Sequence, residues 1–231
     1  AYYPANYLNN GVSHILPDGI ELSANPAQAW KDYFSTYMFM EASADYLDAE
    51  NPVVSFRHIC SLARITYTNQ TGADQAITYF ALKGNQEGTF GTEESGGTPA
   101  DRCGLEVSGL TVADGESVDL YLLFFPKEFK QDGQLQVIMK HPTADELSTS
   151  DISVSLISQA NNGASGFEAG KRYWFQVTET TDGLVWTKDV NQGEEDDETT
   201  VTFTNKEFAK ALEAVLEEGK IWFDEDSCGV M

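Results

Sequence analysis

The sequence predicts an all-β protein built from antiparallel β-sandwiches, and three observations support this class. Strand-like runs rich in β-branched and aromatic residues recur along the chain, as in Ala76–Leu82 and Arg172–Thr178. Each run is bounded by residues typical of turns, such as Asn161-Asn162-Gly163. The runs are short and are not separated by helical patterns, which is typical of antiparallel sandwiches.

The longest predicted strand runs from Val53 to Tyr67, where apolar residues occupy both parities. Alternation over so many residues indicates a long twisted strand, bulged or buried on both faces near its centre. Phe56 shares a parity with Cys60 and Leu62 in this run, so we expect its ring to be buried. Further strands are predicted at Ala76–Leu82, Val118–Phe125, Gln134–Lys140, Ile152–Ser158, Arg172–Thr178 and Leu184–Thr187.

One helix is predicted before the first long strand. In the segment Pro26–Tyr37, aromatic residues recur at helical spacing, and Asn25 is available as an N-cap. We expect this short helix to cover the end of a sheet.

The chain is predicted to form two sandwich domains and a C-terminal extension. The best turn signal between long strands lies at residues 69–75, so the domains are expected to span residues 1–70 and 71–188, the first of them incomplete. Five consecutive acidic residues within Asn191–Glu198 predict a solvated linker. A capping box at Thr204–Glu207 then opens a helix followed by a strand. Residues 189–231 are therefore expected to be an acidic linker and the short α/β start of an additional domain.

The charge of the chain excludes one class of partner. Acids outnumber bases 37 to 14, which gives a formal net charge of −23. Because polyanions would be repelled, we expect no nucleic-acid binding and no direct binding to anionic membranes. The longest apolar run, Leu120–Phe125, is far shorter than the roughly 20 residues of a membrane-spanning helix.

No catalytic constellation is recognisable. The three histidines, His14, His58 and His141, lie far apart in the sequence and outside any metal-binding or nucleophile motif. We therefore predict no enzymatic activity, no catalytic residue and no cofactor.

The three cysteines do not indicate a metal or redox site, because no two share a Cys-x-x-Cys spacing. Cys60 is interpreted as a small core residue, Cys103 as a loop residue and Cys228 as part of the C-terminus. Asp224 and Asp226 copy two positions of a calcium-binding loop, but Cys228 replaces an oxygen ligand. An acidic turn is the favoured interpretation, with calcium binding as the alternative, and no metal ligand is predicted.

Several segments, taken in order, resemble the fimbrillins of Bacteroidales (the Mfa-like and related families). Ala1-Tyr2-Tyr3-Pro4 and Leu16-Pro17-Asp18-Gly19 come first, and Val54–Leu62 is similar to a family strand whose phenylalanine and histidine match Phe56 and His58. The run Leu120–Pro126 and the segment Phe167–Phe175 resemble later family strands. The order of these segments over most of residues 1–188 carries the resemblance.

The resemblance implies two transthyretin-like β-sandwiches in tandem. It also implies export as a lipoprotein to the outer membrane and assembly into a fimbria or a surface adhesin. The expected partners are other fimbrial subunits or ligands on host or bacterial surfaces, and the membrane is reached only through a lipid anchor. The family provides no catalytic or binding residue to carry over, and shaft, tip and non-fimbrial roles all remain open.

Three other interpretations compete with adhesion through strand edges. Aromatic residues make up 12% of the chain, which is compatible with a carbohydrate-binding module. Trp174 and Trp186 are expected in the core, whereas Tyr2, Tyr3 and Tyr7 are freer to stack on sugars. Glu179, within Val177–Thr180, also resembles the glutamate that promotes Lys–Asn isopeptide bonds in Gram-positive pilins, although no matching early lysine motif exists. An unrecognised hydrolase is a further alternative.

Overall fold

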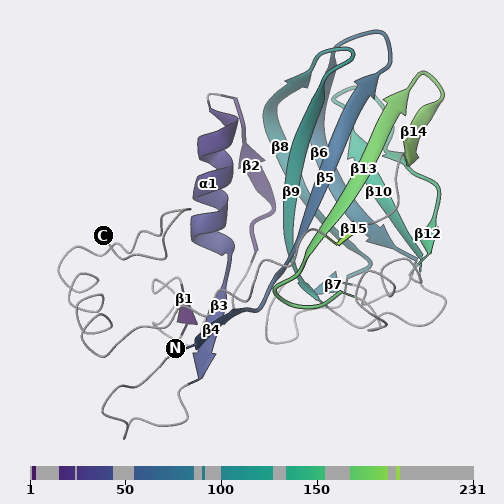
Figure 1. Cartoon of the computed structure of the whole chain (residues 1–231). Coiled ribbons are helices and arrows are strands. Elements are labelled where there is room, and N and C mark those ends of the chain that lie inside the picture. Colours follow the sequence, from purple (N-terminus) through teal and green to yellow (C-terminus); the bar gives the residue numbers. More distant parts are fainter. Residues whose placement is uncertain are drawn as a thin grey trace, which may run out of the picture.

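Two large β-sheets pack face to face and one helix lies beside them (Figure 1). The computed structural model describes residues 2–3, 16–23, 25–43, 55–85, 90–91, 100–126, 134–153, 167–186 and 191–192. This arrangement confirms the all-β sandwich class. A separate three-stranded sheet consists of β1 (Tyr2–Tyr3), β3 (Met40–Ser43) and β4 (Ser55–His58).

The first large sheet, called here the β6 sheet, has the strand order β11-β10-β6-β8-β2, and β12 also pairs with β10. Its central strand β6 runs antiparallel to both of its neighbours, β10 and β8. The strands are β2 (Gly19–Glu21), β6 (Gln75–Gly84), β8 (Arg102–Val112), β10 (Gln134–Lys140), β11 (Leu147–Ser148) and β12 (Ile152–Ser153).

The second large sheet, the β5 sheet, has the order β14-β13-β5-β9-β7, and β15 also pairs with β13. The register places Arg64 of β5 beside Tyr121 of β9 on one side and Trp174 of β13 on the other. The strands are β5 (Ser61–Gln70), β7 (Phe90–Gly91), β9 (Ser117–Pro126), β13 (Arg172–Thr180), β14 (Gly183–Trp186) and β15 (Asn191–Gln192).

Alternation of buried and less buried side chains, strictest in β5, builds the core. In β5, every second side chain from Ser61 to Asn69 is buried, and in β13 the buried parity contains Tyr173, Phe175 and Val177. Because successive side chains point to opposite faces of a strand, one parity of these strands faces the core. The apolar residues of the two inner faces form one hydrophobic cluster.

This continuous core contradicts the predicted domain boundary. Residues 71–74 do form a turn, but the strands on either side, β5 and β6, belong to the two facing sheets of one sandwich. Ile65 before the turn and Phe80 after it lie in the same hydrophobic cluster. The division into domains 1–70 and 71–188 is therefore wrong at this turn, because a turn signal marks a chain reversal and says nothing about which strands share a core. The segment 193–231 lies outside the described residues, and the structure does not test the transthyretin-like detail.

The predicted strand from Val53 to Tyr67 is in fact two strands in two different sheets. β4 ends at His58, and β5 begins at Ser61. At the break, the N–H of Ile59 donates to the carbonyl of Phe39, and the carbonyl of Cys60 accepts from Gly170. The side chain of Phe56 lies outside the described part of the chain, so its burial stays a prediction.

The pairing is also not wholly antiparallel. β5 and β13 run parallel over nine residue pairs, from Leu62 beside Arg172 to Gln70 beside Thr180, and β2 runs parallel to β8. Alternation within a strand is the same for both directions of pairing, so it does not reveal which partner the strand takes.

Several strands were also not predicted from the sequence, and the longest of these is β8. β8 places Cys103 in a strand, where the sequence predicted a loop, because Cys103, Leu105 and Val107 alternate into the core. Asn191 and Gln192, assigned to the solvated linker, form β15 beside Tyr173 and Trp174. Backbone pairing at a sheet edge does not require apolar side chains.

The helix is confirmed with the predicted bounds and cap. α1 spans Pro26–Tyr37, and the Asn25 side chain accepts a hydrogen bond from the N–H of Gln28 at 3.2 Å. Trp30 and Tyr33 form its buried face. The helix lies beside β2, β8 and β9, on one side of the sandwich (Figure 1).

Two glycines with positive φ allow a matched test of the close packing between β8 and Ser23, which follows β2. Gly109→Ala and Gly115→Ala both place alanine at φ near +80°, which strains the backbone by about 1–2 kcal/mol. At Gly109 the new Cβ would also lie 2.6 Å from the Cα of Ser23, whereas Gly115 has no atom within 4 Å. We expect Gly109→Ala to cost about 1–3 kcal/mol more than Gly115→Ala in urea unfolding. Equal losses would show that Ser23 is not held against β8.

Candidate functional site

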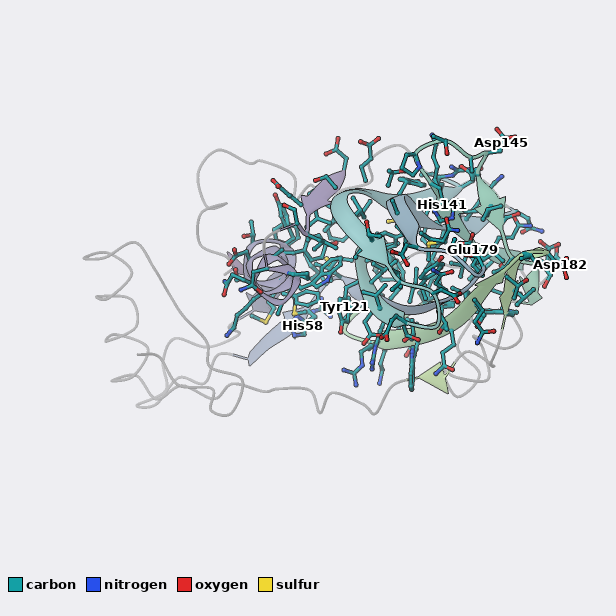
Figure 2. All side chains as sticks on the ribbon, turned by 90° about the horizontal axis from the view of Figure 1, so that it is seen from above. His58, Tyr121, His141, Asp145, Glu179 and Asp182 are labelled. Atoms are coloured by element: carbon teal, nitrogen blue, oxygen red, sulfur yellow. The ribbon has the colours of Figure 1, made fainter. Side chains whose placement is uncertain are left out.

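Polar residues meet inside one end of the sandwich. There, the inward-facing positions at the ends of three strands are occupied by polar residues in place of apolar ones. Tyr67 and Asn69 lie on the buried parity near the end of β5, and Glu179 continues the buried parity of β13. His141 directly follows β10, in phase with the buried Val137 and Met139. Viewed from above, His141 and Glu179 lie next to each other within the sandwich (Figure 2).

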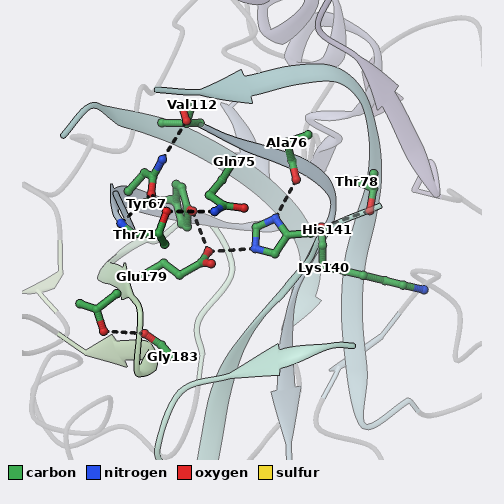
Figure 3. A network of polar contacts seen from close by, with 12 residues as sticks. Tyr67, Thr71, Gln75, Ala76, Thr78, Val112, Lys140, His141, Glu179 and Gly183 are labelled. Atoms are coloured by element: carbon green, nitrogen blue, oxygen red, sulfur yellow. Dashed lines mark hydrogen bonds and ion pairs between the residues drawn. The ribbon is translucent and has the colours of Figure 1, made fainter. Parts of the chain in front are cut away.

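Tyr67, Glu179 and His141 form a buried hydrogen-bonded network that joins the two sheets. The Tyr67 hydroxyl donates to Glu179 Oε2 at 2.7 Å, and His141 Nε2 lies 2.9 Å from the same oxygen. His141 Nδ1 lies 2.7 Å from the carbonyl oxygen of Ala76 in β6. The side chains of His141 and Glu179 are each 7% exposed. Figure 3 shows His141 between Ala76 and Glu179, so the imidazole bridges the β6 sheet and the β5 sheet.

The turn beside this network is held by side-chain hydrogen bonds. The Asn69 amide donates to the carbonyls of Ala73 and Val112, and its oxygen accepts from the N–H of Thr71. The Thr71 hydroxyl in turn accepts from the Gln75 amide at 2.9 Å. Asn69 is fully buried, so these bonds satisfy a polar group that would otherwise destabilise the fold.

The network has the properties of a structural brace. Burial, together with the hydrogen bond to Glu179 and its charge, raises the pKa of the Tyr67 phenol far above its ordinary value, so the hydroxyl stays a donor. A base acting in catalysis needs a substrate proton within reach, but Glu179 and His141 already bind each other and are shielded from solvent. The arrangement is therefore suited to holding two sheets together.

The structure gives one of the three histidines an acidic partner that the sequence did not reveal. His141 contacts Glu179, a pair separated by 38 residues in the sequence. His58 ends β4 and lies on the side of α1, away from His141 and Glu179 (Figure 2). His14 lies outside the described residues.

The isopeptide hypothesis for Glu179 finds no lysine at this site in the described part of the chain. The partners of the Glu179 carboxylate are Tyr67 and His141. The nearest lysine in sequence to His141, Lys140, is exposed, and its side chain extends away from Glu179 (Figure 3). An isopeptide bond needs a lysine amine beside the asparagine amide, so this neighbourhood does not favour one.

A second feature lies on the α1 side of the sandwich, at the outer edge of β9. β5 pairs with one edge of β9 from Ser117 to Phe124, whereas on the other edge the described residues provide a strand, β7, only at Phe125 and Pro126. The N–H of Leu123 points to this outer edge, and Asp119 and Tyr121 share its parity. Their backbone groups therefore face outward too.

Helix α1 covers this edge with aromatic side chains. The N–H of Leu123 donates to the Tyr33 hydroxyl at 3.0 Å, at the position where a neighbouring strand would offer a carbonyl. The ring of Tyr121 lies 5.2 Å from that of Trp30 and 5.3 Å from that of Phe34. Burial raises the pKa of the Tyr33 phenol far above its ordinary value, so its oxygen remains a neutral acceptor. A helix thus takes the place of an edge strand.

The cysteines of the described residues are structural. Cys60 is buried in the core cluster, which confirms the sequence interpretation, and Cys103 lies in the same cluster as a free thiol. The Cys103 sulfur is 3.7 Å from the carbonyl oxygen of Leu123, and burial raises the pKa of this thiol to about 12. Cys228 lies outside the described residues.

Because thiolates are the species that react, we expect Cys103 to be inert in the folded protein. Iodoacetamide at about pH 8 should leave Cys103 unmodified in native protein and label it once the protein is unfolded in urea. Peptide mass spectrometry separates Cys103 from Cys60 and Cys228. Rapid labelling of Cys103 in the native state would contradict its burial at the β8–β9 contact.

The remaining predicted features give no site. Within the described ranges, no group of three His, Cys, Asp or Glu side chains is placed to hold a metal ion. Asp224 and Asp226 lie outside these ranges. No helix in the described part of the chain is both long and apolar enough to cross a membrane.

Comparison with known proteins matches neither a family model nor a curated protein. Solved structures of candidate cell adhesion proteins are similar. One from Bacteroides ovatus is 18% identical with a TM-score of 0.44, covering 85% of this chain and 67% of that one. One from Bacteroides uniformis is 15% identical with a TM-score of 0.36, covering 84% and 70%. One from Parabacteroides distasonis is 9% identical with a TM-score of 0.37, covering 64% and 51%. Likeness at this level leaves the function to be argued from the residues of this chain.

Proposed function

We propose that the protein is a non-enzymatic adhesion protein of the cell surface, a fimbrial subunit or an adhesin, that joins its partner along the outer edge of β9. The observation that carries this proposal is the row of outward backbone groups at Asp119, Tyr121 and Leu123, the last two of which α1 covers in place of a strand. An extended partner segment would pair with these groups by main-chain hydrogen bonds, continuing the antiparallel pairing that β7 makes at Phe125. Export as an outer-membrane lipoprotein belongs to the same proposal.

The partner strand has to replace the contacts of α1. Tyr33 satisfies the N–H of Leu123 through a single side-chain bond, whereas a paired strand would satisfy several outward groups at once. α1 would then move aside when the partner binds. Its hold on the edge depends on the Tyr33 hydroxyl and on the packing of Trp30 and Phe34 against Tyr121.

Overlapping ten-residue peptides covering the whole chain, as strands of a second copy, provide the test. Binding is measured by fluorescence anisotropy and by thermal stabilisation. Tyr121→Pro removes an outward N–H while leaving the inward-facing bonds to β5, and Tyr121→Ala is the matched control that keeps the N–H. We expect a peptide that binds the wild type and Tyr121→Ala to bind Tyr121→Pro at least tenfold more weakly. Tyr33→Phe should bind it more tightly, because α1 is then held less firmly.

Carbohydrate binding is the second candidate, and one observation favours it. Trp174, expected in the core, lies on the outer face of the β5 sheet and is half-buried. The Arg64 guanidinium stacks 4.7 Å from the centroid of its ring, and Arg64 also pairs with Asp119 at 2.7 Å. An ordered row of aromatic and charged groups on a sheet face is a surface on which a sugar could stack. A specific hit on a glycan array that Trp174→Ala abolishes, with no peptide binding, would favour this function over strand addition.

A further inference from the structure

The hydrogen bonds of His141 reveal how many protons its network contains. The carbonyl oxygen of Ala76, 2.7 Å from His141 Nδ1, has no hydrogen to donate. Nδ1 must therefore carry the hydrogen of this bond. In a neutral imidazole only one ring nitrogen is protonated, so Nε2 of a neutral His141 would present a lone pair.

That lone pair would face another acceptor. Nε2 lies 2.9 Å from Glu179 Oε2, and an ionised carboxylate has only lone pairs to offer. The Tyr67 hydroxyl, 2.7 Å from the same oxygen, donates its own hydrogen and cannot fill the gap between Nε2 and Oε2. The contact is a hydrogen bond only when one additional proton lies between His141 and Glu179, whether it resides on the imidazole or on the carboxyl.

Among the described residues around the network, no other charged group takes the place of this additional proton. Tyr67 faces the pair from β5, Glu179 comes from β13, the Ala76 carbonyl faces it from β6, and His141 follows β10. Lys140 extends away from the pair (Figure 3). In the part of the chain that the structure describes, neither His141 nor Glu179 makes a further ion pair, and both are almost fully buried.

We infer that the Tyr67–Glu179–His141 network is a proton-binding site, in which one proton taken up on folding joins the β6 sheet to the β5 sheet. This inference does not rest on the proposed function, because it concerns only contacts inside the sandwich. The site gives the protein a fold whose stability depends on pH above neutrality.

The direction in which stability changes with pH follows from the number of protons that the folded and unfolded states bind. In an unfolded chain above about pH 7, an exposed histidine is neutral and an exposed glutamate is ionised, so the two hold no shared proton. The folded network holds one. Folding therefore takes up a proton in this range, and stability falls as pH rises, with the unfolding equilibrium constant growing up to tenfold per pH unit.

Glu179→Gln is the variant that separates a proton-binding network from a merely hydrogen-bonded one. The amide introduced there can donate to Nε2 of neutral His141 and to the Tyr67 oxygen, so every contact is satisfied without an additional proton. Tyr67→Phe is the matched control, because it deletes a hydrogen bond to Glu179 but leaves the shared proton.

Urea unfolding between about pH 7 and pH 9 provides the measurement. We expect the unfolding equilibrium constant of the wild type and Tyr67→Phe to rise with pH, and we expect Glu179→Gln to lose the part of this rise due to one proton. Equal pH dependence of the wild type and Glu179→Gln would overturn the inference.

NMR of the ¹⁵N-histidine-labelled wild type gives an answer even if Glu179→Gln fails to fold. We expect a downfield, slowly exchanging proton at the Nε2 side of His141 at about pH 8. An Nε2 shift typical of a bare nitrogen, without such a proton, would overturn the inference directly.

Discussion

Replacing His141 with alanine is expected to lower the free energy of unfolding by about 3–5 kcal/mol. The substitution leaves the Glu179 carboxylate buried and deprived of one partner, and it leaves the Ala76 carbonyl without the donor it has in the wild type. Removing one member of a buried pair is costly because the other member has lost its water without keeping its partner. Urea unfolding at about pH 7, followed by tryptophan fluorescence, measures the loss.

Lys140→Ala is the control for this prediction. Lys140 precedes His141 in the chain, but its side chain is exposed and extends away from the network (Figure 3). We expect its replacement to change stability by no more than about 0.5 kcal/mol, as is usual for exposed sites. A similar effect of both substitutions would mean that the bridge between the sheets contributes nothing of its own.

Phe124→Ala is expected to have an effect of comparable size, about 3–5 kcal/mol, by emptying a core position. Phe124 of β9 is fully buried, and its ring lies 5.5 Å from that of Phe90 and 4.7 Å from that of Phe167. These aromatic residues come from three distant segments of the chain, so one truncation weakens the attachment of all three. Thermal and urea unfolding report the loss.

The matched control here is Val185→Ala in β14. Val185 is 44% exposed and lies in the same sheet as Phe124, so its truncation opens no cavity. We expect a change within about 0.5 kcal/mol. A small effect of Phe124→Ala would show that the cluster around Phe90 and Phe167 repacks freely.

The strand content and the helix were predictable because their signals are local. The aromatic spacing and the Asn25 cap of Pro26–Tyr37 depend only on residues within a few positions of each other, and the helix has those bounds. The strands β6, β9, β10 and β13 likewise follow from alternation and β propensity over short windows. β8 was missed because glycines at positions 104 and 109 interrupt its pattern, and because its buried parity shifts by one residue between Val107 and Leu110.

The sequence indicates which polar residues of the candidate site are buried, but it does not indicate which residues they contact. A glutamate on the buried parity of β13, after Tyr173, Phe175 and Val177, is a local signal, and so is His141 in phase with Val137 and Met139. A charged residue on an apolar parity indicates a buried partner. The identity of that partner is not a local property, since Tyr67 and Glu179 are 112 residues apart.

The sequence by itself determined the class of fold and the position of the helix. Each of these follows from the period of side chains along one strand or helix, which a short window contains. Only the tertiary structure decided that β5 pairs in parallel with β13, that the turn at residues 71–74 lies within one core, and that α1 covers β9. It also decided that His141 meets Glu179. Each of these contacts joins segments that are far apart in the sequence, and many alternative partners are available. The free energy that selects among the alternatives comes from packing all the strands together.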